Sequence, residues 1–296
     1  MASARSARRS PATSASRLLA RASGFTGTTS AQQPTGRILS LVRATTPRIS
    51  TLRRREGRLP TVSTYPERRG ALRRFAAGVV RPANAALTRR LWTGQEHVPA
   101  SGGVIVACNH LSVVDPIAVA HFLYAAGRFP RFLAKDGLFR VPVLGRALLG
   151  LGQIPVYRES AKAGEAFRAA IAAVREGACI VVYPEATVTR DPALWPMTGK
   201  TGIARIALAT GAPVVPVASW GAQEVWPYHG RPRPLPRKPV RVTAGPPVDL
   251  GGYGVGTADP AVTHEVTDKV MRAVTELVSA LRGEPAPEER FDRGTG

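Results

Sequence analysis

Short apolar runs alternate with longer amphipathic segments over most of the chain. The apolar runs are rich in Val and Ile and predict strands at 104–108, 132–135, 154–157, 178–183, 214–218 and 240–244. Apolar residues at helical spacing predict helices at 116–126, 141–151, 164–176, 201–210 and 259–282. Strand–helix alternation of this kind predicts an α/β fold with a mostly parallel sheet flanked by helices.

The first 65 residues lack this pattern. They are rich in Ser, Thr, Ala and Arg, and they hold 12 Arg but a single acid, Glu56. Such a segment buries too little apolar surface to fold, so we expect a disordered tail. Mitochondrial transit peptides have a similar composition, and a basic arm for anionic lipid or nucleic acid is a third interpretation. The arginine bias of the whole chain favours the disordered tail of a bacterial protein. Part of this tail is expected to come from a start codon assigned too far upstream.

Residues 66–92 combine apolar positions with arginines. Leu72, Phe75 and Val79 recur at helical spacing, and arginines lie between and beside them. A segment of this kind is typical of helices that lie on an anionic membrane surface. The alternative is a helix packed on its own domain with its arginines in solvent. Pro82 predicts a break into two short helices.

The charge balance favours anionic partners. The chain has 41 Lys and Arg against 20 Asp and Glu, a net charge of +21. Aromatic residues do not interleave with the basic ones, so no specific nucleic acid is expected. No apolar run approaches the length of a membrane-spanning helix, so membrane contact is expected from the surface. Residues 93–283 are predicted to form the main domain and 284–296 a loose tail.

The cysteine and histidine positions favour neither disulfides nor a metal site. Cys108 and Cys179 both lie in apolar runs, which predicts buried, reduced thiols. The histidines other than His110 are scattered without the spacing of metal ligands.

Chemically capable side chains follow four successive predicted strands. His110 follows the first, Lys135 ends the second, Arg158 follows the third and Glu185 follows the fourth. In open α/β sheets, ligands bind beyond the carboxyl ends of the strands. These four side chains are therefore expected at one site.

The strongest candidate for catalysis is the turn Asn109-His110-x4-Asp115. A neutral imidazole can accept a proton from a hydroxyl near pH 7, and a carboxylate on its other nitrogen fixes the tautomer. Asp115 also suits a helix N-cap, with Pro116 as the first helical residue, so helix capping alone is the alternative. Ser219 does not lie in a Gly-x-Ser-x-Gly elbow. The dyad is therefore expected to activate a hydroxyl of the substrate directly.

This turn resembles the first motif of the glycerolipid acyltransferases, the family of the lysophosphatidic acid acyltransferases. Three later blocks are similar to further motifs of that family: 152–158 ending in Arg158, 183–187 around Glu185, and 214–217 with a proline. The third block departs from the usual Phe-Pro-Glu-Gly-Thr-Arg-Ser, since Ala186 replaces glycine and Val188 replaces arginine. Pro216 in the fourth block also suggests an edge strand or a bulge.

The resemblance implies transfer of a fatty acyl group from acyl-coenzyme A or acyl carrier protein to the hydroxyl of 1-acyl-glycerol-3-phosphate, which makes phosphatidic acid. It implies that His110 is the base and that Asp115 orients it. Arg158 and Lys135 would bind the acceptor phosphate, and Glu185, Thr187 and Asn109 would hold the rest of the acceptor. The site residues are thus His110, Asp115, Asn109, Lys135, Arg158, Glu185 and Thr187.

No metal or bound cofactor is implied. The expected partners are a lysophospholipid, the acidic acyl donor and an anionic membrane. The expected location is the cytoplasmic face of a bacterial plasma membrane. The altered third motif leaves a different lysolipid or a glycolipid open as acceptor. A non-enzymatic protein that binds lipid or nucleic acid through its basic tail is the remaining alternative.

Overall fold

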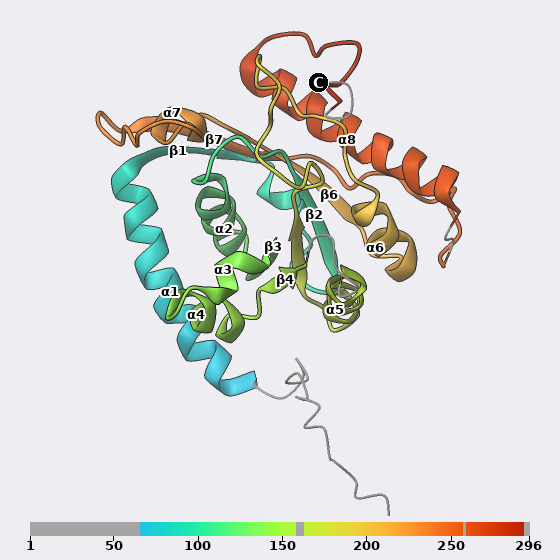
Figure 1. The fold of residues 1–296 in the computed structure, drawn as a ribbon, viewed down its shortest axis with the longest axis horizontal. Helices are drawn as coiled ribbons and strands as arrows, with labels where there is room; N and C mark the ends of the chain where they lie inside the picture. Colours follow the sequence, from blue (N-terminus) through green and yellow to red (C-terminus); the bar gives the residue numbers. More distant parts are fainter. Residues whose placement is uncertain (1–65, 158–162, 257–258, 293–296) are drawn as a thin grey trace, which may run out of the picture. The chain divides into compact units, whose positions relative to one another are not determined.

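The computed structural model describes residues 66–157, 163–256 and 259–292 (Figure 1). The tail predicted at 1–65 and the site residue Arg158 lie outside these ranges. No helix in the described ranges is both long and apolar enough to cross a bilayer.

A seven-stranded sheet forms the centre of the fold. Its strands, in spatial order, are β1 (Thr88–Thr93), β7 (Lys238–Ala244), β6 (Val214–Trp220), β2 (Val104–Cys108), β5 (Cys179–Val182), β3 (Pro130–Lys135) and β4 (Ile154–Val156). Every neighbouring pair is parallel except β6 with β7. The prediction of an α/β fold with a mostly parallel sheet is confirmed.

Helices cover both faces of this sheet (Figure 1). They are α1 (Pro66–Leu87), α2 (Asp115–Ala125), α3 (Asp136–Arg140), α4 (Leu144–Gly150), α5 (Ala163–Arg175), α6 (Gly202–Thr210), α7 (Ala222–Val225) and α8 (Pro260–Arg282), with a 3-10 turn at Gln95–His97. On one face of β2, Val106 shares a core with Phe122 of α2. On the other face, Ile105 shares a core with Ile206 of α6 and Val270 of α8. Burial on both faces explains why β2 is a continuous apolar run.

The predicted break at Pro82 is wrong. The α1 helix runs unbroken through Pro82 to Leu87. Proline removes one backbone hydrogen bond from a helix, but tertiary contacts hold the segment on both sides of it. Ala77 is buried, and the buried Asn84 side chain is hydrogen-bonded to His121 of α2.

Strand β1 was not expected, because its sequence is polar. Thr88–Thr93 reads Thr-Arg-Arg-Leu-Trp-Thr and most of its side chains are exposed. It lies at the edge of the sheet and pairs with β7 alone. Main-chain pairing with β7 therefore determines this strand, and no apolar alternation marks it.

The position of Pro216 also differs from the prediction. Strand β6 is internal, between β7 and β2, so Pro216 is not on an edge. The antiparallel ladder with β7 begins at Val217, paired with Ala244. Pro216 therefore lies just before that ladder, so its missing N–H removes no hydrogen bond from the ladder between β6 and β7.

Candidate active site

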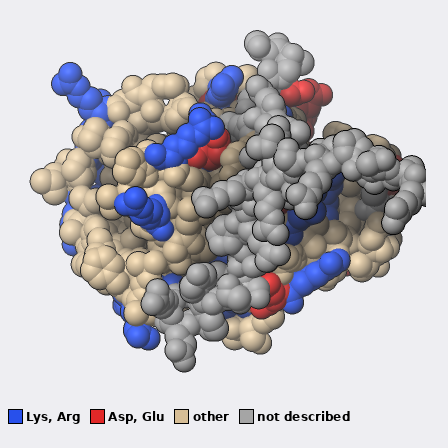
Figure 2. Space-filling model, turned by 60° about the horizontal axis from the view of Figure 1, so that its bottom comes forward, with Lys and Arg blue, Asp and Glu red and all other residues tan. Residues whose placement is uncertain are grey.

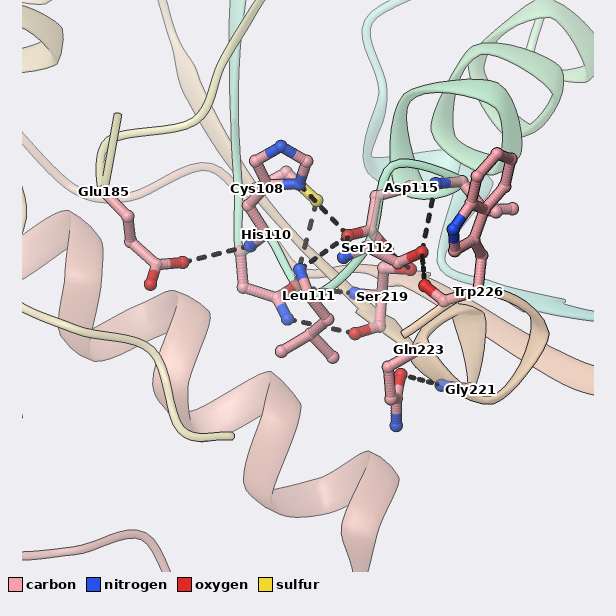
Figure 3. A network of polar contacts seen from close by, with 12 residues as sticks. Cys108, His110, Leu111, Ser112, Asp115, Glu185, Ser219, Gly221, Gln223 and Trp226 are labelled. Carbon is pink, nitrogen blue, oxygen red and sulfur yellow. Dashed lines mark hydrogen bonds and ion pairs between the residues drawn. The ribbon is translucent and has the colours of Figure 1, made fainter. Parts of the chain in front are cut away.

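The turn between β2 and α2 brings the two expected catalytic side chains together (Figure 3). His110 Nδ1 lies 3.2 Å from Asp115 Oδ2; the His110 side chain is 17% exposed, and Asp115 is fully buried. One ring nitrogen is thus held by a buried carboxylate, while the ring keeps access to solvent. This is the arrangement expected of a histidine that accepts a proton at Nε2.

The sequence suggested that Asp115 is the N-cap of α2, and the structure shows that it is not. Val114 occupies that position, and Asp115 lies in the first turn of the helix. Its Oδ2 accepts hydrogen bonds from the backbone N–H of Leu111 and of Ser112, both at 2.6 Å. The carboxylate therefore folds the turn back on itself and presents the same oxygen to His110.

Ser219 at the end of β6 supplies a further contact that the sequence did not indicate. Its hydroxyl donates to Asp115 Oδ1 at 2.9 Å. The Asn109 side chain fixes Ser219, since Ser219 N–H donates to Asn109 Oδ1 at 2.8 Å and Asn109 Nδ2 donates to the Ser219 carbonyl at 3.0 Å. Both residues are fully buried. Asn109 thus joins β2 to β6 behind the dyad, and contact of Asn109 with substrate stays a prediction.

Glu185 approaches the dyad from the loop after β5. It is fully buried. One carboxylate oxygen accepts from the His110 backbone N–H at 3.0 Å, and the other accepts from the Met197 backbone N–H at 3.0 Å. The observed contacts of Glu185 fix the main chain at His110, whereas its contact with an acceptor stays a prediction.

Tyr183 forms one wall of the histidine site. Its ring stacks on the His110 imidazole, with centroids 4.3 Å apart and an interplanar angle of 25°. The Phe132 ring also stacks with Tyr183, with centroids 6.3 Å apart. Burial raises the pKa of the Tyr183 phenol well above its usual value. The phenol is therefore neutral at pH 7, and its ring restricts rotation of the imidazole.

No side chain of the described residues is placed as a nucleophile on the dyad. Ser112 Oγ donates to the Trp226 carbonyl at 2.6 Å, and Ser219 Oγ is engaged with Asp115. Cys108 and Cys179 are buried and free, as predicted, and burial raises the pKa of both thiols, that of Cys179 to about 12. Nε2 of His110 is thus open to a hydroxyl brought by a substrate.

Within the described residues, neither Lys135 nor Thr187 is hydrogen-bonded to the dyad. Lys135 ends β3 and is exposed. Since β5 separates β2 from β3, the ends of these strands are about 10 Å apart. Thr187 is half-buried in the loop after β5. Within the described ranges, no group of three or more His, Cys, Asp or Glu side chains is arranged to hold a metal ion.

Ser219 and Tyr183 are the residues that sequence reasoning missed. Ser219 was considered only as a nucleophile, although it ends a strand and the rule applied to His110 and Lys135 covers it equally. Tyr183 stands where the third motif usually has phenylalanine. Its contact with His110 follows from β5 lying next to β2, and the strand order is not readable from the sequence.

Comparison with known proteins agrees with this geometry. Residues 89–220 match the family model described as Acyltransferase. A chloroplastic 1-acyl-sn-glycerol-3-phosphate acyltransferase of Brassica napus is 31% identical over 156 residues, which cover 50% of this chain and 44% of the relative. A 1-acyl-sn-glycerol-3-phosphate acyltransferase of Borreliella burgdorferi is 34% identical over 128 residues, which cover 42% of this chain and 48% of the relative. The chain thus spans about half the length of these curated relatives.

A solved structure shares the fold. The 1-acyl-sn-glycerophosphate acyltransferase of Thermotoga maritima superimposes with a TM-score of 0.56 at 23% identity, covering 74% of this chain and 83% of that one. The family match runs from β1 through β6 and includes the His110–Asp115 dyad and Ser219. Residues 89–220 of this chain are therefore similar to the domain that defines the acyltransferase family.

Proposed function

We propose that the protein transfers a fatty acyl group from an acyl thioester to the free hydroxyl of 1-acyl-glycerol-3-phosphate. The observation that carries the proposal is the dyad, in which His110 Nδ1 lies 3.2 Å from the buried Asp115 while the described residues place no nucleophile of the protein on Nε2. The names of the Brassica and Borreliella relatives support the acceptor. The donor is proposed to be acyl-coenzyme A or acyl carrier protein.

The mechanism is a direct transfer. Nε2 of His110 takes the proton from the acceptor hydroxyl as the hydroxyl oxygen attacks the thioester carbonyl carbon. Asp115 stabilises the imidazolium that forms. The tetrahedral intermediate then expels the thiolate, which takes the proton from Nε2. An ester and a thiol are the products, and His110 is neutral again.

Lys135 and Arg158 are proposed to bind the acceptor phosphate. Lys135 is exposed at the end of β3, and Arg158 is assigned this task through the second motif. A guanidinium matches two phosphate oxygens at once, and an ammonium adds a point charge. On the face seen in Figure 2, Lys and Arg side chains stand out from a largely uncharged surface, with few acidic side chains in view among the described residues. Such a surface favours an acidic donor and an anionic acceptor.

Contact with a membrane surface is proposed to run through α1. Phe75 is 71% exposed and Val79 is 53% exposed on this helix. Arg74 and Arg81 are exposed on the same helix. Exposed apolar side chains beside arginines suit the interface of an anionic membrane, and we propose the cytoplasmic face of a bacterial plasma membrane.

A second candidate keeps the reaction and changes the acceptor. Val188, which stands where the third motif usually has arginine, is 5% exposed and points into the core. This position offers no cation to a phosphate. Another lysolipid or a glycolipid is therefore the competing acceptor.

One assay tests the proposal and separates the acceptors. Purified protein is incubated with labelled acyl-coenzyme A or acyl carrier protein and a panel of lysolipids, and products are separated by thin-layer chromatography. We expect phosphatidic acid from lysophosphatidate, in preference to acylation of uncharged monoacylglycerol. Preference for a neutral or glycosylated acceptor would favour the second candidate, and no transfer to any acceptor would refute both.

A further inference from the structure

A recess separate from the dyad lies between α1, β1 and α2, and we call it the α1–β1 recess. Its volume is about 330 Å³, and its walls include Ala77, Pro82 and Ala85 of α1. Arg81 of α1 and Arg90 of β1 also line it, and His121 of α2 completes the lining. The recess thus combines apolar walls with two cations and one imidazole.

The imidazole of His121 is held in one tautomer. The Asn84 amide nitrogen lies 3.1 Å from His121 Nδ1. Thr88 Oγ1 donates to the Asn84 carbonyl at 2.7 Å and also lies 3.2 Å from Asn84 Oδ1. Because the amide nitrogen can only donate, Nδ1 accepts and the proton lies on Nε2. Burial, followed by the charges of Arg90 and Arg81, lowers the pKa of His121 to about 4. At pH 7 the ring is therefore neutral and keeps an N–H donor.

Among the described residues, no side-chain hydrogen bond is formed at Nε2 of His121. His121 is 2% exposed and lines the recess. Its one side-chain hydrogen bond is the contact of Nδ1 with Asn84. The indole of Trp92 lies edge to face with the ring, 4.8 Å between centroids, and fixes its orientation. A ligand oxygen bound in the recess could accept a hydrogen bond from this N–H.

The two arginines are fixed by aromatic rings and not by acids. The Arg81 guanidinium lies 5.6 Å from the Tyr124 ring centroid, and that of Arg90 lies 5.4 Å from the Trp92 ring centroid. Neither takes part in an ion pair with a described residue. A stacked guanidinium keeps its in-plane N–H donors available. Two like charges brought to one recess without a carboxylate are best neutralised by a bound anion.

We propose that the α1–β1 recess binds a phosphate group, either free or as the headgroup of an anionic lipid. Arg81 and Arg90 provide the charge-assisted donors, His121 Nε2 provides a neutral donor, and the α1 wall accommodates the carbon atoms next to the phosphate. The recess is distinct from the acyl-transfer site. His121 follows Asp115 by six residues on α2, which is about 9 Å along the helix axis.

The test follows the imidazole signals of His121 by NMR in the full-length protein. These signals are identified by their absence in His121→Gln. The probes are inorganic phosphate, dihexanoylphosphatidic acid and dihexanoylphosphatidylcholine. We expect the phosphatidic acid to shift the His121 signals in a saturable manner and the zwitterionic lipid to leave them unchanged. Because the readout is local to His121, it does not depend on whether the protein transfers acyl groups.

A matched pair of variants separates a defined site from general charge attraction. Arg81→Ala with Arg90→Ala removes two charges from the recess, and Arg74→Ala with Arg89→Ala removes two charges from the same helix and strand outside it. We expect the first pair to weaken binding by about tenfold or more, as for two charge-assisted contacts, and the second pair to have little effect. If the first pair does not fold, Arg81→Lys with Arg90→Lys replaces it, and binding is again expected to weaken.

The outcomes decide the proposal. If inorganic phosphate competes with the lipid, the recess recognises the phosphate alone. If the lipid binds without such competition, the recess recognises the headgroup together with the apolar wall. Both outcomes support the site. Unchanged His121 signals at millimolar phosphatidic acid would overturn it. Equal weakening by the two alanine pairs would also overturn it, since the attraction would then be nonspecific.

Discussion

The imidazole of His110 is positioned by residues that never need to touch substrate. The Asp115 carboxylate has four partners: two backbone N–H groups of its own turn, His110 and Ser219. Rotation of the carboxylate toward any other partner would break several of these contacts together. The orientation of the general base therefore depends on β6 as well as on its own turn.

Ser219→Ala is expected to lower kcat by about tenfold, because small displacements of a reacting group have large effects on rate. The KM values should change little, since Ser219 is fully buried. Thr275→Val serves as the control, because it removes another buried hydroxyl, one that donates to the Met271 carbonyl in α8. Equal effects of the two substitutions on kcat would show that Ser219 has no positioning role.

Ala186 has a backbone conformation that favours glycine. Its φ is 57°, in the left-handed region, at the position where the third motif usually has glycine. Relief of the Cβ strain outweighs the greater flexibility of glycine in the unfolded chain, so Ala186→Gly should raise the free energy of unfolding by about 0.5–1 kcal/mol. Urea denaturation measures this difference. A lower unfolding midpoint for the glycine variant would contradict this interpretation of the loop.

At the scale of elements, α1 is attached to the sheet domain through a polar contact. Asn84 of α1 is buried and bonds to His121 of α2, and Thr88 at the start of β1 bonds to Asn84 in turn. These contacts hold the C-terminal half of α1, beyond Pro82, against the domain.

Burial of His121, together with the nearby charges of Arg90 and Arg81, makes stability depend on pH. The pKa of His121 is lowered from 6.5 to about 4 in the folded protein, so between these values the unfolded chain binds more protons. The contribution of neutral His121 to the free energy of unfolding is therefore fully present above about pH 6.5, and it is lost as the pH falls toward about 4. Melting temperatures across this range should fall more steeply for the wild type than for His121→Gln. Parallel curves would contradict the lowered pKa.

The elements differ in how far the sequence determines them. Strand β2 is predicted to the residue, because burial on both faces leaves an apolar run that a turn ends on either side. Strand β1 has no such run, since it is an edge strand with exposed arginines. Continuation of α1 through Pro82 depends on contacts with α2, which no local pattern encodes.

The residues of the candidate site also divide into those predicted from local sequence and those that depend on the folded sheet. His110 and Asp115 lie on one turn, so their pairing could be predicted from local spacing. The contacts of Ser219, Tyr183 and Glu185 depend on β6 and β5 being the two neighbours of β2, and this order is a property of the folded sheet. Sequence reasoning therefore identified the dyad, Asn109 and Glu185, but it missed Ser219 and Tyr183 and the contacts by which these residues position His110.

At the scale of the whole molecule, the proposed activity requires contact with a lipid surface. Phe75→Asp with Val79→Asp should reduce co-sedimentation with vesicles of phosphatidylcholine and phosphatidylglycerol, because it places charge where apolar side chains enter the interface. Leu235→Asp is the control, since Leu235 is 76% exposed on the loop before β7. Equal vesicle binding by the α1 variant and the control would remove α1 from the membrane contact.

The central claim is that the His110 imidazole accepts the proton of the acceptor hydroxyl during acyl transfer. The most direct measurement is the rate of phosphatidic acid formation from lysophosphatidate and acyl-coenzyme A by the wild type and by His110→Ala, with near- and far-UV circular dichroism to verify the fold. The account predicts an active wild type and a rate lower by at least about 10²–10⁴-fold in a folded His110→Ala. A folded His110→Ala that retains the wild-type rate would contradict it.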